Sequence, residues 1–461
     1  MNYDHGAMAI HSGFNYRGIL RENTLPNGKQ PMKSPARSSY YLIISALLFL
    51  FFFAWSSTYA LYASWLEKVM GIDASTRGFI FMANGIAALM LQPVYGMLQD
   101  RLGTSKKLLT WVGLMLVLCT PAMAYVFPPL MSAFPIAGMA FGALYMSLAM
   151  FAGVGVVESY SERMARSKGF EFGGARLWGS IGWGAGSVVA GYFTINQNLP
   201  FYACSFAGIA FLVMLALLKN NTAPKEEKKY AVQATSSLGQ SFALFAQGNF
   251  WKFTLFLFGV SGLYFLFDQQ FQNYYSAMYN EQTLTASGQQ AYSWLLAAQT
   301  LTEAVCLLVA PWVINRIGSR NGLILCSALM SLRVFGCSQI SNVWFLSVCH
   351  LIRGIEIPVL LVAVFKYINS VFDSRYSSTI YLISFQFAQQ FYSICFSAAT
   401  GYAFGAYGYP STYFVLAISA MVFTAWGIFM LPRARQDQDS GITPEKKAAS
   451  SSNSATGAQT A

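Results

Sequence analysis

The stretch VWFLSVCHLIRGIEIPVLLVAVF, residues 343–365, carries three ionisable side chains inside an otherwise apolar run. Its length suits the roughly 20 residues that an α-helix needs to cross a bilayer. The ionisable residues are His350, Arg353 and Glu356, each about one helical turn from the next. A charge at the middle of a bilayer costs about 3 kcal/mol or more unless a partner compensates it. We therefore expect a membrane-spanning helix whose charges are kept for function.

The composition of the whole chain is that of a membrane protein. Of its 461 residues, 55% are hydrophobic and only 10% are charged, whereas about a quarter of a soluble domain is charged. Apolar runs of spanning length occur about twelve times, at residues 41–66, 78–99, 108–130, 134–157, 172–195, 199–218, 251–279, 290–314, 322–339, 343–366, 377–403 and 410–432. The sequence predicts an all-α membrane protein with twelve transmembrane helices.

Lysine and arginine gather in alternate loops, which predicts the orientation of the chain. They precede the first span and follow the second and fourth, as Arg17, Arg21, Lys29, Lys33, Arg37, Arg101, Lys106, Lys107, Arg163, Arg166 and Lys168. Because positively charged loops stay inside, both termini are predicted to be cytoplasmic. The net charge of +11 follows from this topology. Nucleic-acid binding is not needed to explain it.

Polar segments divide the chain into domains. Residues 1–40 and 433–461 lack periodicity and are predicted to be cytoplasmic tails. The polar start argues against a cleavable signal peptide, and Met32 is an alternative translation start. Residues 219–249 form a polar linker between two predicted six-helix bundles, residues 41–218 and 250–432.

Two related loops indicate an internal duplication. GMLQDRLGTSKK at residues 96–107 and PWVINRIGSRN at residues 311–321 each follow the second span of their half. Both contain an Asp/Asn-Arg-x-Gly turn, and we expect these turns to act in conformational change. The residues singled out are Gly96, Asp100, Arg101, Gly103, Arg316 and Gly318. Transporters are commonly built from such repeats.

Neither a metal site nor an enzyme is expected. The seven cysteines lie in apolar spans without the close spacing of metal ligands, which favours simple packing over metal binding or disulfides. HExxH and GxSxG motifs are missing from the sequence, so an enzyme acting within the membrane is not favoured.

Several segments resemble the oligosaccharide:proton symporters, the lactose, raffinose and sucrose permease group of the major facilitator superfamily. Residues 96–107 are similar to the superfamily's signature loop. The group itself is indicated by VVESYSERMARSKGFEFGGARLWGSIGW at 156–183, FDQQF at 267–271, APWVINRIGSRNGLIL at 310–325, EIPVLLVAVFKYI at 356–368 and SSTIYL at 377–382. The resemblance covers nearly everything between the tails. It implies the major facilitator fold and a bacterial inner-membrane location.

The resemblance implies a sugar site in the first half. Glu158 and Arg176 match the carboxylate and guanidinium that hold sugar hydroxyls in this group, and both groups form paired hydrogen bonds well. Trp183 lies seven residues after Arg176, on the same helical face, where relatives place an aromatic ring against the sugar. For Trp183 alone, packing or an interfacial position is the alternative reading.

The resemblance also implies a proton site in the second half. Glu356 matches the proton-carrying carboxylate and Arg333 the arginine that expels the proton. Asp268, also a candidate sugar ligand, matches an acidic residue that pairs with a cation on the tenth span, here His350. Arg353 replaces the usual histidine, and we expect it to be a fixed partner for Glu356 or a sugar donor. Whether His350 is charged, and whether these ion pairs are only structural, stays open.

Differences within the group favour sucrose as the substrate. Lactose-type carriers have a carboxylate where Thr300 stands, whereas this chain has Glu303 about one turn later. They also have an aspartate and a lysine where Phe265 and Gln389 stand, and losing both avoids a stranded charge. The sucrose permeases share both features. Lactose, melibiose and raffinose types remain alternatives.

The resemblance therefore implies proton-coupled disaccharide symport by alternating access. The expected partners are the sugar, the proton and the lipid bilayer, with no cofactor, and we expect a monomer. A sugar sensor that does not transport is the rival function, but it would not need Arg333 and Glu356.

Overall fold

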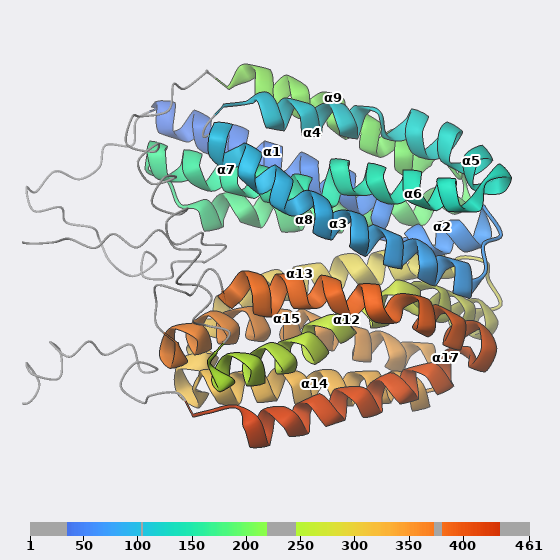
Figure 1. Cartoon of the computed structure of the whole chain (residues 1–461). Coiled ribbons are helices and arrows are strands. Elements are labelled where there is room, and N and C mark those ends of the chain that lie inside the picture. The colour runs from blue at the N-terminus through green and yellow to red at the C-terminus, as the bar shows by residue number, and fades with distance from the viewer. Residues whose placement is uncertain (1–34, 103–104, 219–245, 373–379, 434–461) are drawn as a thin grey trace, which may run out of the picture.

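The structure is a computed structural model that describes residues 35–102, 105–218, 246–372 and 380–433. Met32, Gly103 and most of the predicted tails and linker lie outside the described residues. Two bundles of roughly parallel helices lie side by side, one from each half of the chain (Figure 1).

The first half is built from six membrane crossings. Two of the crossings contain a short π-helical segment, η2 and η3. The elements are α1 Pro35–Tyr59, α2 Tyr62–Lys68, α3 Ala74–Leu102, α4 Lys107–Val117, η2 Thr120–Val126, α5 Phe127–Ala133, α6 Pro135–Met146, η3 Ser147–Phe151, α7 Gly153–Lys168, α8 Phe172–Gly191, η4 Tyr192–Thr194 and α9 Leu199–Leu217.

The second half has longer, less interrupted helices. They are α12 Gly248–Thr283, α13 Gly288–Ile317, α14 Ser319–Gln339, α15 Val343–Val371, η6 Leu382–Phe387 and α17 Ala388–Met430. Within α17, Gly408 has φ 76° and Pro410 follows, so one continuous element contains two crossings joined by a tight turn.

Twelve crossings are present in the described part of the chain, as predicted. Ten helical segments are long and apolar enough to span a bilayer, and one of them, Ile383–Met430, contains both crossings of α17. The remaining crossing is α8, which is 20 residues long but rich in glycine and interrupted by Arg176. The first span begins at Pro35, inside the tail predicted at 1–40.

The glycines of α8 bring it against α1. A Cβ at Gly182 would lie 2.3 Å from the carbonyl oxygen of Phe49, and one at Gly186 would lie 2.4 Å from that of Phe53. Only glycine permits such close helix contact, as is common between membrane helices. This contact fixes the faces of α8 that carry Arg176 and Trp183.

The two halves touch at the end opposite the described chain ends. The Cα atom of Gly401 in α17 would lie 3.1 Å from a Cβ placed on Gly78 in α3. In the same region Arg77 Nε donates to Gln270 Oε1 at 3.1 Å, and the hydroxyl of Ser64 donates to Asn273. The halves are therefore joined at this end of the molecule, on the right of Figure 1.

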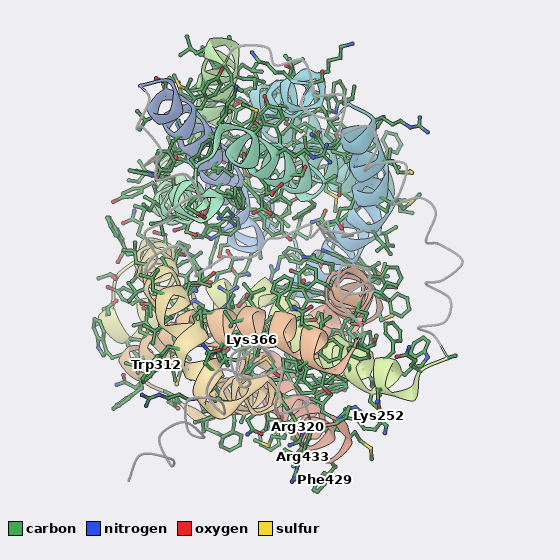
Figure 2. All side chains as sticks on the ribbon, turned by 90° about the vertical axis from the view of Figure 1, so that its left-hand side faces the viewer. Lys252, Trp312, Arg320, Lys366, Phe429 and Arg433 are labelled. Atoms are coloured by element: carbon green, nitrogen blue, oxygen red, sulfur yellow. The ribbon has the colours of Figure 1, made fainter. Side chains whose placement is uncertain are left out.

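The opposite end carries basic side chains. Helix α1 begins and α17 finishes there (Figure 1). Figure 2 looks onto this end, where Lys252, Arg320, Lys366 and Arg433 lie at helix termini of the second half.

Candidate functional site

An ion pair in the first half joins two crossings. Arg176 Nε on α8 lies 2.6 Å from Glu158 Oε1 on α7. The two side chains are 27% and 28% exposed although each sits within a membrane-spanning helix. The guanidinium also covers the ring of Phe52 on α1, with its carbon 4.1 Å from the ring centroid. The pair therefore has an apolar floor and a face open to a ligand.

Aromatic rings extend this face. Trp183 packs edge-to-face against Trp55 of α1, with ring centroids 5.3 Å apart, and Trp55 contacts Phe151 at 5.9 Å. Trp183 is only partly buried. An aromatic surface beside a paired carboxylate and guanidinium suits a ligand with both hydroxyl groups and an apolar ring face.

A second ion pair lies completely inside the other half. Arg333 Nε on α14 donates to both carboxylate oxygens of Glu356 on α15, at 2.9 and 3.1 Å. Both side chains are 0% exposed. The hydroxyl of Tyr264 donates to Glu356 Oε2 at 2.7 Å, and Phe267 lies 4.3 Å beneath the guanidinium carbon. The Glu356 carboxylate thus accepts three hydrogen bonds in a place closed to solvent.

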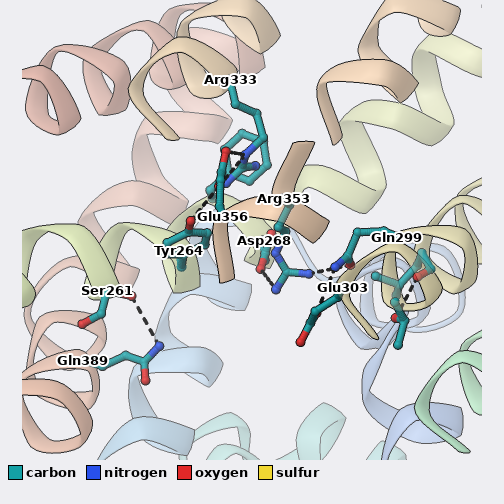
Figure 3. Close-up of polar contacts among 12 residues, drawn as sticks. Ser261, Tyr264, Asp268, Gln299, Glu303, Arg333, Arg353, Glu356 and Gln389 are labelled. Atoms are coloured by element: carbon teal, nitrogen blue, oxygen red, sulfur yellow. Dashed lines mark hydrogen bonds and ion pairs between the residues drawn. The ribbon is translucent and has the colours of Figure 1, made fainter. Parts of the chain in front are cut away.

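A third polar cluster runs between the helices of the second half (Figure 3). Arg353 Nη2 lies 2.6 Å from Asp268 Oδ2, and its Nη1 donates to Gln299 Oε1 at 2.9 Å. Gln299 Nε2 in turn donates to Glu303 Oε2 at 3.1 Å. Helices α12, α13 and α15 are thus joined by one chain of contacts, which we call the Asp268–Glu303 chain.

This arrangement corrects the expected partner of Asp268. The sequence suggested His350, whereas the structure gives Asp268 the guanidinium of Arg353, one turn further along α15. Arg353 is accordingly not the partner of Glu356, which Arg333 holds.

His350 is buried among aromatic rings. Its ring stacks on Phe271 with centroids 4.8 Å apart and planes 7° apart, and Tyr292 lies 5.6 Å away. The side chain is 0% exposed, and neither ring nitrogen has a hydrogen-bond partner among the described residues. A protonated ring would be an uncompensated buried charge, so this setting fits a neutral imidazole.

A close helix contact explains why Arg353 reaches α13. A Cβ on Gly354 would lie 2.9 Å from the carbonyl oxygen of Gln299 and 2.9 Å from Cβ of Thr302. The absence of a side chain at Gly354 lets α15 press against α13 beside Gln299. Neighbouring Arg353 is therefore directed at the Gln299 amide.

The charged groups of the two halves face each other. Arg176 lies on α8 of the first half and Glu303 on α13 of the second. Helices α8 and α13 approach between them, where a Cβ on Gly184 would lie 3.8 Å from Ala297 Cα. The Glu158–Arg176 pair and the Asp268–Glu303 chain are thus opposite walls of one central region.

The positions that differ from lactose-type carriers hold only neutral contacts. Gln389 Nε2 donates to the carbonyl oxygen of Ser261 at 3.4 Å, and the Thr300 hydroxyl donates to that of Leu296 at 2.9 Å. The side chain of Phe265 is outside the described residues.

The duplicated loops differ in how much of them is described. Gly96 and Arg101 are exposed near the end of α3, while Gly103 and the side chain of Asp100 are outside the description. Arg316 covers the ring of Trp312 at 4.0 Å. Gly318 has φ 84°, a conformation that favours glycine, and it separates α13 from α14.

Sequence reasoning missed four residues of these clusters. Phe52 and Trp55 were hidden among many aromatic residues of the first span. Tyr264 and Gln299 each lie one turn before a carboxylate that was recognised, Asp268 and Glu303. That spacing on one helical face was the available signal.

Comparisons of sequence identify the family of the chain. Residues 33–440 match a family described as "LacY proton/sugar symporter". The sucrose permease of Escherichia coli is 34% identical over 87% of this chain and 96% of its own length. The raffinose permease of Escherichia coli is 33% identical over 86% and 94%, and the melibiose permease of Enterobacter cloacae is 33% identical over 85% and 92%.

Comparisons of structure agree on the fold. The nucleoside transporter NupG superposes with a TM-score of 0.70 at 17% identity, over 84% of this chain and 98% of that one. The D-xylose-proton symporter gives a TM-score of 0.63 at 13% identity, over 86% and 98%. The fold is that of the major facilitator transporters, and the family is one of transporters rather than enzymes. With a family match across nearly all of its described residues, the chain belongs to the LacY proton/sugar symporters.

Proposed function

We propose that the protein imports sucrose together with one proton across the bacterial inner membrane. The family supports proton-coupled transport of an oligosaccharide. Sucrose is favoured because the chain has Glu303 and lacks a charge pair at Phe265 and Gln389, as the sucrose permeases do. The sucrose permease of Escherichia coli is also among its most similar relatives.

The observation that carries this proposal is the contrast between two Glu–Arg pairs. Glu158 and Arg176 are about a quarter exposed, so they are accessible to a ligand the size of a sugar. Arg333 and Glu356 are completely buried, so a proton is the ligand that suits them. A proton added to Glu356 would weaken its attraction to Arg333 and change the packing of α14 against α15.

The proposed cycle uses both pairs. Glu356 takes up a proton, and the sugar then binds between the halves. Its proposed ligands are Glu158, Arg176, Trp183, Asp268 and Glu303. With both ligands bound, the halves rock about the central site and release the sugar and the proton on the other side. In the proposed cycle, the arrangement in which Arg333 and Tyr264 hydrogen-bond Glu356 is assigned to the state after proton release.

The proposed orientation places the basic end of Figure 2 in the cytoplasm, with both termini. Lys252, Arg320, Lys366 and Arg433 support this through the positive-inside rule. The joined end near Gly78 and Gly401 is then periplasmic, and the conformation faces inward. We propose a monomer that needs no cofactor.

The test is the pH of a lightly buffered, de-energised cell suspension after sugar is added. Sucrose should alkalinise the medium, and lactose, melibiose, raffinose and maltose should give smaller changes. A larger response to raffinose or melibiose would reassign the substrate. Binding without any pH change for every sugar would favour the sensor and reject symport.

A further inference from the structure

Gln299 has an orientation that only its two charged neighbours explain. Its carbonyl oxygen accepts from Arg353 and its amide nitrogen donates to Glu303. Turning the amide over would point its NH₂ group at a guanidinium and its oxygen at a carboxylate, which is unfavourable at both ends. The Gln299 amide therefore has one favourable orientation, with its oxygen toward the Arg353 cation and its nitrogen toward the Glu303 anion.

Its burial separates Gln299 from the sugar. Gln299 is 1% exposed, whereas Glu303 and Arg353 are partly exposed. It thus lies behind the two charged groups and holds them from inside the protein. Because Gln299 carries no charge of its own, a change at Arg353 or at Glu303 can act on the other group through the two hydrogen bonds of the amide.

We propose that Gln299 is a positioning residue, which fixes Glu303 and Arg353 as one composite wall of the sugar site and transmits sugar binding to Asp268. This rests on the proposed function. The first half presents its carboxylate and guanidinium in direct contact, as Glu158 and Arg176. The second half also has a direct carboxylate–guanidinium contact, Asp268 with Arg353, but it adds a second carboxylate, Glu303, which the Gln299 amide spaces apart from Arg353.

Two substitutions separate positioning from packing. Gln299→Leu keeps most of the volume but removes both hydrogen bonds, so sugar affinity should fall about tenfold. Gln389→Leu is the matched control, because Gln389 is also an intramembrane amide, but its recorded bond goes to the backbone of Ser261. The control should change affinity less than about twofold.

Gln299→Glu gives a readout that a packing role would not produce. The new carboxylate still accepts from Arg353 but faces Glu303 without a donor. A proton shared between the two carboxyl groups restores the missing bond. Sucrose affinity relative to the unmodified protein at the same pH should therefore recover as pH falls from about 8 to about 5.5. Gln299→Leu should show no such recovery.

Other titratable groups near this site, Asp268 and Glu356 among them, are the same in the two proteins, so comparing them at the same pH removes their contribution. The groups that face Gln299 are Asp268 from α12, Arg353 from α15 and Arg176 from α8, with Arg333 and Glu356 paired to each other and His350 without a hydrogen-bond partner among the described residues. The arginines do not titrate in this range. Exchanging the two residues, Gln299→Glu with Glu303→Gln, rebuilds the donor–acceptor pair and should remove the added pH dependence.

A second measurement needs no sugar and so separates this inference from the proposed function. The thermal midpoint of purified Gln299→Glu in detergent should rise toward that of the unmodified protein on acidification, and the exchanged double variant should not show this rise. Midpoints and sucrose affinities of Gln299→Glu that equal those of the unmodified protein at every pH would overturn the inference. If no sugar changes the pH of the cell suspension with the unmodified protein, the proposed symport is wrong. The thermal midpoints would still show whether Gln299 positions Glu303 and Arg353.

Discussion

The two halves hold the same pair of side chains in opposite surroundings. Arg176 and Glu158 contact each other through one nitrogen and one oxygen at 2.6 Å, and both are more than a quarter exposed. Arg333 places one nitrogen against both oxygens of Glu356 and neither residue is exposed. The comparison teaches that the two pairs differ in exposure and not in residue type, and our proposal assigns the exposed pair to the sugar and the buried pair to the proton.

The surroundings follow from the partner helices. In the first half, α8 lies on α1 through glycines, which leaves Arg176 at the inner surface above Phe52. In the second half, Tyr264 and Phe267 of α12 cover the Arg333–Glu356 pair. Breaking such a buried pair typically costs 3–5 kcal/mol, whereas an exposed pair is worth about 1 kcal/mol or less.

Arg176→Ala should give the largest loss of sugar binding. The variant removes the proposed guanidinium ligand and leaves Glu158 without its partner, so affinity should fall by about a hundredfold or more. Arg176→Lys should restore only part, because it cannot form paired hydrogen bonds. Binding is measured by titrating the purified protein with sucrose, or by the protection that bound sucrose gives to the purified protein. An unchanged affinity would remove Arg176 from the site.

Asp268→Asn should have the next largest effect. It weakens the ion pair with Arg353, and transport should drop about tenfold or more. Combining it with Arg353→Gln removes both charges, and we expect the double variant to be more stable than Asp268→Asn alone. Thermal midpoints of the three variants form the test. A simple sum of the single effects would mean that the 2.6 Å contact carries no coupling.

Trp183→Phe should weaken sugar binding moderately. A smaller ring still packs against Trp55 but offers less surface, so affinity should fall about three- to tenfold. Trp178→Phe, on an exposed part of the same helix, is the control. Proton translocation per sugar should stay constant in both. If Trp178→Phe has the larger effect, the sugar face of α8 is assigned wrongly.

His350→Phe should have the smallest effect among these. A phenyl ring can keep the stack on Phe271, and an uncharged histidine has no salt bridge to lose. Transport should remain within about twofold, whereas His350→Lys should destabilise the protein by burying a charge without a partner. Uptake and thermal midpoint are compared for both. Loss of proton coupling in His350→Phe would make this histidine a second proton site.

Much of this fold was predictable, because membrane helices must be long and apolar. The two Glu–Arg pairs were also expected, since residues matching both members of each pair were recognised in the sequence. The partner of Asp268 was not predictable, because His350 and Arg353 lie one turn apart on the same face. Which of them reaches α12 depends on helix rotation and on the close contact at Gly354.

Neutral residues gave the weakest signal. Gln299 is important only because its amide hydrogen-bonds Arg353 and Glu303, and these two residues belong to different helices. The contact of Tyr264 with Glu356 likewise follows only from the placement of α12 beside α15. Charge in an apolar run marks a site, whereas an uncharged connector gives only a weak spacing signal, and its role is found from the packing.

The most direct test of the division of roles is Glu356→Gln. The amide oxygen still accepts from Arg333 and the NH₂ group can donate to the Tyr264 hydroxyl, but the side chain cannot release a proton. Glu281→Gln on the exposed end of α12 is the control. In membrane vesicles, we predict that the variant exchanges internal for external sucrose at nearly the normal rate while it fails to accumulate sucrose under a proton gradient. Full accumulation by Glu356→Gln, or loss of exchange in correctly folded protein, would contradict the assignment of the buried pair to the proton.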